Sequence, residues 1–85
     1  MIDDEQAKQN IAINLRRLME TRGYTQTALA KATGASQSRI SQVLRGYHMA
    51  GGGLLARIAE VFDVSVDRLV GPPPEEFAEI STKSA

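Results

Sequence analysis

The chain has 85 residues, a length that suits one domain built around one modest apolar core. It has no cysteine, which excludes a disulfide framework and a thiolate zinc cluster. Its single histidine, His48, cannot form a metal site alone, so we expect neither a metal nor a cofactor. The net charge is zero, but residues 6–59 contain eight basic residues and only one acidic residue, Glu20, while both ends are acidic. Such asymmetry is typical of a face that binds a polyanion.

The sequence also argues against a membrane protein. No apolar run approaches the roughly 18 residues that a spanning helix requires. Close to its N-terminus the chain has three acidic residues, Asp3, Asp4 and Glu5, where a signal peptide would be positively charged. We therefore expect a cytoplasmic protein with no membrane contact.

A first helix is predicted from about Asp4 to Arg22. Its apolar residues recur at helical spacing, and Asp3 or Asp4 is available as the N-cap. Gly23 then ends the helix, because glycine adopts the left-handed conformation that closes a helix end. The residues expected on the buried face are Ile11, Leu15, Leu18 and Met19.

Two short helices are predicted next, separated by a tight turn. Thr25 caps a helix from Gln26 to about Thr33, and Ser36 caps a third helix from Gln37 to Arg45 that Gly46 closes. Gly34 lies between them, and the connection is so short that the third helix must run at a sharp angle to the second. We expect the small residues Ala30 and Gly34 to be buried where these helices cross closely.

A fourth helix is expected from about Gly52 to Phe62, followed by a short turn around Val66 to Val70. Gly71 and the three prolines after it end regular structure. Since no stretch alternates apolar and polar residues, the fold class is all-α. We assign residues 1–71 to the domain and 72–85 to an acidic tail, either flexible or an arm that packs on a second copy or another partner.

The third helix has a polar face suited to DNA. At about 100° per residue, five polar residues fall within roughly 140°, opposite Ile40, Val43 and Leu44. Glutamine matches the donor and acceptor of adenine, arginine binds guanine or phosphate, and serine fills either role. No carboxylate faces the phosphates. The polar residues are Gln37, Ser38, Ser41, Gln42 and Arg45.

The stretch YTQTALAKATGASQSRISQVLRG, residues 24–46, closely resembles the helix-turn-helix of phage repressor and Cro-type (XRE-like) DNA-binding domains. Leu29 and Ala30 match the core pair of the motif's first helix, Gly34 its turn glycine, and Ile40 and Val43 the anchors of its recognition helix. The likeness continues through LLARIAEVFDVSVDRLV, residues 54–70. It implies a compact five-helix domain of the lambda repressor-like type with a central helix-turn-helix.

The resemblance also implies roles for individual residues. The positions that match base-reading residues of the family are Gln37, Ser38, Ser41 and Gln42. The positions that match phosphate contacts are Gln26, Arg45 and Tyr47. Arg39, on the flank of the third helix, contacts either a phosphate or solvent.

The three glycines 51–53 depart from the family, in which a proline and a hydroxyl cap are more usual at this point. They fit either a flexible loop with a poor cap, or a helix start whose free N–H groups approach a phosphate, with Gly52 as a contact. Arg57 has Glu60 and Asp63 as alternative partners and then has no role in DNA binding. Arg16 and Arg17 are expected to be exposed helix charges.

We expect no enzymatic activity, because nothing around His48, Asp63 and Ser65 supplies an activated nucleophile. We expect a sequence-specific transcriptional regulator that binds double-stranded DNA, a repressor that acts as a homodimer on a palindromic operator. The contacts between the two copies are expected around residues 62–70. One alternative is an antitoxin-type module that neutralises a toxin partner and autoregulates its operon. Another is a helix-turn-helix domain retained only for dimerisation.

Overall fold

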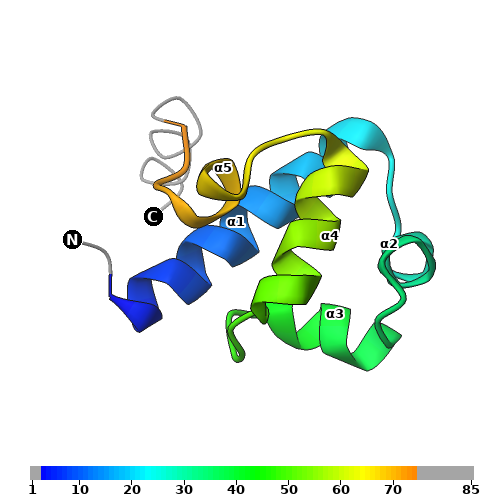
Figure 1. Ribbon diagram of the computed structural model, residues 1–85, viewed down its shortest axis with the longest axis horizontal. Helices are drawn as coiled ribbons and strands as arrows, with labels where there is room; N and C mark the ends of the chain where they lie inside the picture. Colours follow the sequence, from blue (N-terminus) through cyan, green and yellow to red (C-terminus); the bar gives the residue numbers. More distant parts are fainter. Residues whose placement is uncertain (1–2, 75–85) are drawn as a thin grey trace.

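The computed structural model describes residues 3–74, and all regular structure in that range is helical. Five helices pack around one core (Figure 1), as the all-α prediction required. Their bounds are α1 Asp4–Arg22, α2 Gln26–Thr33, α3 Gln37–Leu44, α4 Gly52–Phe62 and α5 Val66–Val70. The third helix thus ends one residue earlier than predicted, and Arg45 is its C-cap.

The helix starts follow from hydroxyl and carboxylate caps that the sequence displays. Asp3, Thr25, Ser36 and Ser65 each accept a hydrogen bond from the backbone N–H three residues later, which satisfies one of the unpaired donors at a helix start. The start of α4 is different, because Gly51 supplies no side-chain cap. Its first N–H groups therefore have no partner from the capping residue.

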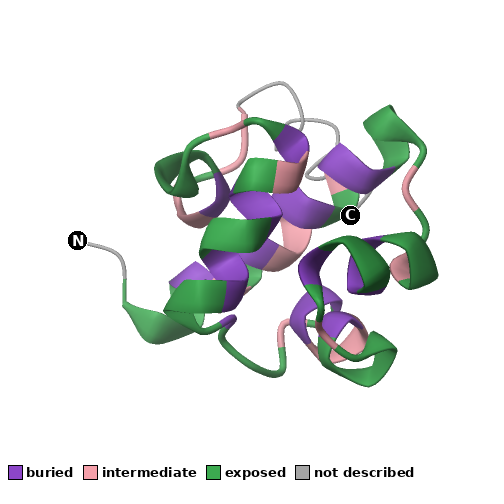
Figure 2. Ribbon diagram, turned by 45° about the vertical axis from the view of Figure 1, so that its right-hand side comes forward, coloured by how far each residue is buried: buried purple, intermediate pink, exposed green. Residues whose placement is uncertain are grey.

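The core forms where the apolar faces of the helices meet (Figure 2). α1 packs against α3 and α5, while α2 packs against α3 and α4. The ring of Tyr24 meets that of Phe62 edge-on at 5.1 Å between centroids, an arrangement that aromatic quadrupoles favour. The largest fully buried side chains are Phe62, Ile11, Leu15, Leu29, Ile40, Ile58, Leu69, Val43 and Asn10.

The predicted steric role of Gly34 is wrong. Ala30 is buried as expected, but Gly34 is exposed, and a Cβ added to it would meet no heavy atom within 4 Å. Glycine is favoured at this position because of the backbone conformation. Its φ is +77°, in the left-handed region that residues with a Cβ rarely adopt. Its N–H bonds to the carbonyl of Ala30 and ends α2.

Two buried asparagines hold α5 against α1, a feature that the sequence analysis did not anticipate. Asn14 Nδ2 donates to the carbonyl oxygens of Leu69 and Gly71, each at 2.9 Å, and Asn10 Nδ2 donates to that of Val70 at 2.9 Å. The last carbonyls of a helix lack partners within it. The side chains of α1 thus complete the end of a five-residue helix too short to be stable alone.

Within residues 3–74, no helix combines the length and the apolar character that crossing a membrane demands. The predicted domain boundary at residue 71 stays a prediction. Residues 72–74 follow α5 without regular structure, and residues 75–85 of the predicted tail lie outside the described residues.

Candidate nucleic-acid interface

The polar face of α3 lies at the surface, as the sequence predicted, but not uniformly. Ile40, Val43 and Leu44 are buried against the core. At the start of the helix, Gln37 and Ser38 are exposed, whereas Ser41 and Gln42, one turn later, are half-buried. The side chains freest to meet a partner are therefore in the first turn, and the half-buried pair has a more restricted approach.

Hydrogen bonds stabilise both ends of α3, and the one at its carboxyl end also joins it to α1. Ser36 Oγ accepts from the N–H of Arg39 at 3.0 Å at its start. At its end, Arg16 Nη2 on α1 donates to the carbonyl oxygen of Leu44 at 2.9 Å. A cation at the carboxyl end of a helix also complements the helix dipole. Arg16 was expected to be only an exposed helix charge, and that prediction missed its role in orienting α3.

The chain after α3 folds back on the helix. Gly46 has φ of +74°, and the N–H of Tyr47 bonds to the carbonyl of Gln42 at 3.1 Å. This turn leaves Tyr47 67% exposed and Arg45 exposed at the end of the polar face. Both therefore lie at the surface, where phosphate contacts were predicted.

Gln26, the remaining predicted phosphate contact on the helix pair, is the first residue of α2 and is half-buried. Thr25 Oγ1 caps this helix by accepting from the N–H of Ala28. The first turn of α2 contains no acidic residue. Its positive dipole end is therefore not neutralised by a carboxylate of that turn.

A basic hollow of about 430 Å³ lies between the starts of α3 and α4. Arg39 Nη2 lies 3.7 Å from the position that a Cβ on Gly51 would occupy, and Arg57 Nη1 lies 4.0 Å from the equivalent position on Gly53. The lining contains two arginines and no carboxylate. It consists of Gly34, Ala35, Ser36, Arg39, Gly51, Gly53, Leu54 and Arg57.

The expected pairing of Arg57 with an acidic neighbour is wrong. Within residues 3–74, neither Glu60 nor Asp63 forms an ion pair with Arg57. The arginine instead lines the hollow beside the uncapped start of α4, where Gly52 is exposed. Arg57 thus joins Arg39 in a setting that suits an anion. Sequence spacing could not reveal this, because Arg39 and Arg57 are on different helices.

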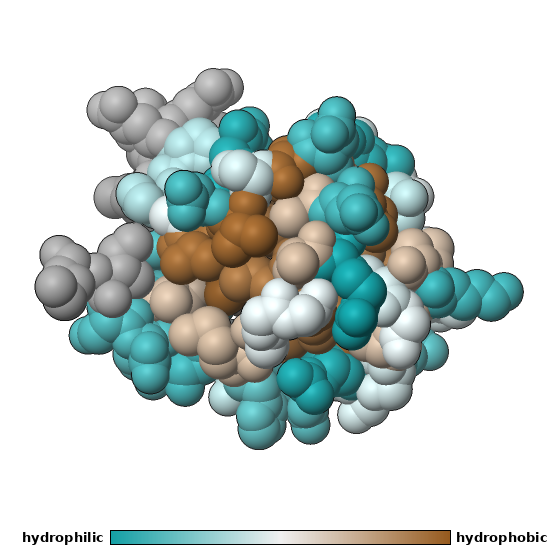
Figure 3. All heavy atoms as spheres, in the orientation of Figure 1, coloured by the Kyte–Doolittle hydropathy of each residue, from teal (hydrophilic) through white to brown (hydrophobic). Residues whose placement is uncertain are grey.

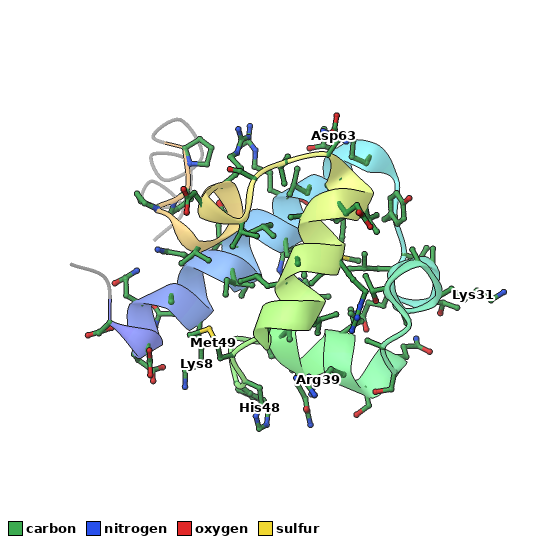
Figure 4. All side chains as sticks on the ribbon, in the orientation of Figure 1. Lys8, Lys31, Arg39, His48, Met49 and Asp63 are labelled. Carbon is green, nitrogen blue, oxygen red and sulfur yellow. The ribbon has the colours of Figure 1, made fainter. Side chains whose placement is uncertain are left out.

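Basic side chains extend from the side of the fold formed by α3. Figure 4 shows Arg39, His48 and Lys8 at this lower side, Lys8 reaching it from α1. Lys8 also pairs with Glu5 at 3.3 Å. The segment 21–59 contains five basic residues and no Asp or Glu. Lys8 and His48 were not among the predicted site residues, and they reach this side only through the fold.

Comparison with known proteins gives a consistent result. The sequence pattern of the helix-turn-helix family HTH_3 matches residues 15–69. The chain is 34% identical over 62 residues to a Bacillus subtilis protein described as the uncharacterized HTH-type transcriptional regulator YazB, which covers 73% of this chain and 87% of that protein.

Solved structures share the fold. A hypothetical transcription factor, NHTF, from Neisseria superposes with a TM-score of 0.76 at 25% identity, over 93% of this chain and 92% of that one. An HTH_3 family transcriptional regulator from Vibrio cholerae gives a TM-score of 0.72 at 30% identity, over 79% of this chain. This chain spans only 38% of the Vibrio protein.

Proposed function

The chain belongs to the HTH_3 family of helix-turn-helix DNA-binding transcriptional regulators, the Cro/C1 type, and from this premise we propose how it recognises DNA. The members of this family are not enzymes. α3 enters the major groove of one specific duplex sequence, and two copies bind the half-sites of a palindromic operator and repress transcription. The protein would then act in the cytoplasm. The observation that carries the proposal is the carboxylate-free polar face of α3, held at the surface by its contacts with α1.

Base recognition is assigned to four side chains of α3. Gln37 and Ser38 are exposed in its first turn and reach base edges first. Ser41 and Gln42 are half-buried, so their remaining polar surface contacts bases only when the helix lies deep in the groove. A glutamine that donates to and accepts from one adenine contributes about 1–3 kcal/mol of discrimination.

Phosphate binding is assigned to groups that surround α3. They include the exposed side chains at its end and flank, the start of α2, and the basic hollow with its uncapped N–H groups at the start of α4. Helix starts favour anions because unpaired backbone N–H groups point outward there and the helix dipole is positive at that end. The residues are Gln26, Arg39, Arg45, Tyr47, Gly52 and, added from the structure, Arg57.

The homodimer is proposed from size and exposed apolar surface. Half-sites on one face of DNA lie about 34–36 Å apart, and the longest extent of the domain is 35 Å. Apolar surface gathers between α5 and α4 (Figure 3), and Val66 is 38% exposed while Val70 is half-buried. Phe62 and Leu69, within the predicted contact region, are fully buried, so Val66 and Val70 are the better candidates for contact.

The decisive experiment is selection of bound duplexes from a random pool, followed by affinity measurements on the recovered sequence. We expect a palindrome with half-sites one helical turn apart. Gln37→Ala should weaken binding to the selected site by about 1–3 kcal/mol while leaving non-specific binding unchanged. Lys31→Gln is the matched control, because Lys31 points away from the molecule on α2 (Figure 4).

Two results would contradict the proposal. A recovered site without dyad symmetry would exclude the dimer on a palindrome. An equal loss for Gln37→Ala on selected and random DNA would exclude base recognition by that residue. In the antitoxin alternative, the acidic tail or α5 would bind a toxin partner. Residues 75–85 of that tail lie outside the described residues, and this alternative is not proposed.

A further inference from the structure

The basic hollow between the starts of α3 and α4 carries two positive charges that no carboxylate balances. Arg39 comes from α3 and Arg57 from α4, and neither forms an ion pair with a carboxylate of residues 3–74. Arg39 Nη2 lies 3.7 Å from the Cβ position of Gly51. Arg57 Nη1 lies 4.0 Å from that of Gly53, so both guanidinium groups border the glycine segment. An anion placed in the hollow would be stabilised by both.

The backbone at this place favours an anion as well. Gly51 provides no side-chain cap, so the first N–H groups of α4 have no partner from the capping residue. The positive end of the helix dipole lies there, and the first turn of α4 contains no acidic residue. The start of α3 borders the hollow through Ser36 and Arg39, and its first turn contains no acidic residue either. Two helix starts and two arginines therefore meet at one space.

The size and lining of the hollow suit a small organic molecule with an anionic group. Its volume is about 430 Å³, and pockets that hold small ligands measure roughly 300–1,000 Å³. Beside the arginines, the lining contains the half-buried Ala35 and the buried Leu54. The arginines can bind the anionic group while the apolar side chains contact the organic part of the same molecule.

The charge of the hollow favours a phosphate monoester over the phosphodiester of DNA. A monoester carries a charge of about −1.5 to −2 at pH 7 and has three strong acceptor oxygens, which match two arginines. A phosphate of the DNA backbone carries only a single negative charge. We propose that the basic hollow binds a free small molecule with a phosphate monoester, and that this ligand displaces DNA. The displacement rests on the proposed function, in which the same hollow contacts a DNA phosphate.

Ligand binding is tested without DNA, by NMR titration of the isotope-labelled full chain at constant ionic strength. The probes are methyl phosphate, phenyl phosphate and the diester dimethyl phosphate. We expect both monoesters to shift the backbone signals of residues 51–54 and the side-chain signals of Arg39 and Arg57, phenyl phosphate at the lower concentration because of its apolar ring. Dimethyl phosphate should bind more weakly than methyl phosphate. Arg57→Gln should weaken monoester binding by about two- to fivefold, the range for exposed ion pairs, and the control Lys31→Gln should not change it.

Displacement is tested by fluorescence anisotropy on the selected duplex. Phenyl phosphate at about ten times its own Kd should weaken duplex binding about tenfold relative to NaCl of equal ionic strength, and Arg57→Gln should reduce this effect. Shifts that do not map to the hollow, equal affinities for methyl phosphate and dimethyl phosphate, or an effect no larger than that of NaCl would overturn the inference. A chain that binds the monoesters but no duplex would refute the proposed function and the displacement. A chain that binds the duplex but no monoester would refute only the inference.

Discussion

Substitutions at Gly34 distinguish a conformational role for this glycine from a packing role. Gly34→Ala places a Cβ on a residue with φ of +77°, and a left-handed residue with a side chain costs about 1–2 kcal/mol. There is no packing term, because the Cβ would meet no heavy atom within 4 Å. The lower entropy of the unfolded alanine chain offsets about 0.4–1 kcal/mol, so the net loss should be about 1 kcal/mol.

Gly34→Asn provides the critical comparison. Asparagine tolerates the left-handed conformation better than alanine, so this variant should be at least as stable as Gly34→Ala despite its larger side chain. Urea unfolding and thermal unfolding followed by far-ultraviolet circular dichroism measure both, and 1 kcal/mol corresponds to about 4–8 °C for a domain of this size. If the asparagine variant were clearly the less stable of the two, α2 and α3 would have to pack tightly around Gly34, and the reasoning would be refuted.

Three further substitutions test other contacts. Asn14→Leu should lower the free energy of unfolding by about 2–4 kcal/mol, because the carbonyls of Leu69 and Gly71 lose their donor and the bond to Leu69 is buried. A loss below about 1 kcal/mol in urea unfolding would count against this role. Arg16→Met should cost about 1 kcal/mol through the lost hydrogen bond to the carbonyl of Leu44, which unchanged urea unfolding would disprove. Gly52→Pro should leave thermal stability unchanged or raised, because Gly52 is the first residue of α4 and proline suits that position. Gly51 already has the extended backbone that the residue before a proline requires, with φ of −64° and ψ of 161°. The same change removes an N–H from the proposed phosphate contact and should weaken DNA binding, so unaltered affinity in a fluorescence anisotropy titration would exclude that contact.

The helices of this protein could be located from the sequence because their signals are local. The hydroxyl caps Thr25 and Ser36 and the glycines with positive φ each act within one turn of the chain. The observed bounds of α1, α2 and α4 match the predicted ones, and α3 differs by one residue. The α4 start also matches, although Gly51 provides no side-chain cap and the packing of Leu54, Leu55 and Ile58 must stabilise that helix.

The site was predicted only in part. Helical periodicity correctly separated the buried face of α3 from its polar face, but it gave Ser41 and Gln42 the same exposure as Gln37, since it takes no account of neighbouring elements. Arg39 and Arg57 of the basic hollow could not be grouped from the sequence, because they lie on different helices.

The sequence by itself determined where each described helix begins and, to within one residue, where it ends. It also determined which helix face is apolar and that the central segment is basic, because these properties depend on residues within a few positions of one another. The tertiary structure alone decided that Arg16 would bind the end of α3, that Asn14 would bind the end of α5, and that a Cβ on Gly34 would meet open space. Those outcomes depend on how the helices pack, and packing joins residues as far as 60 positions apart in the chain.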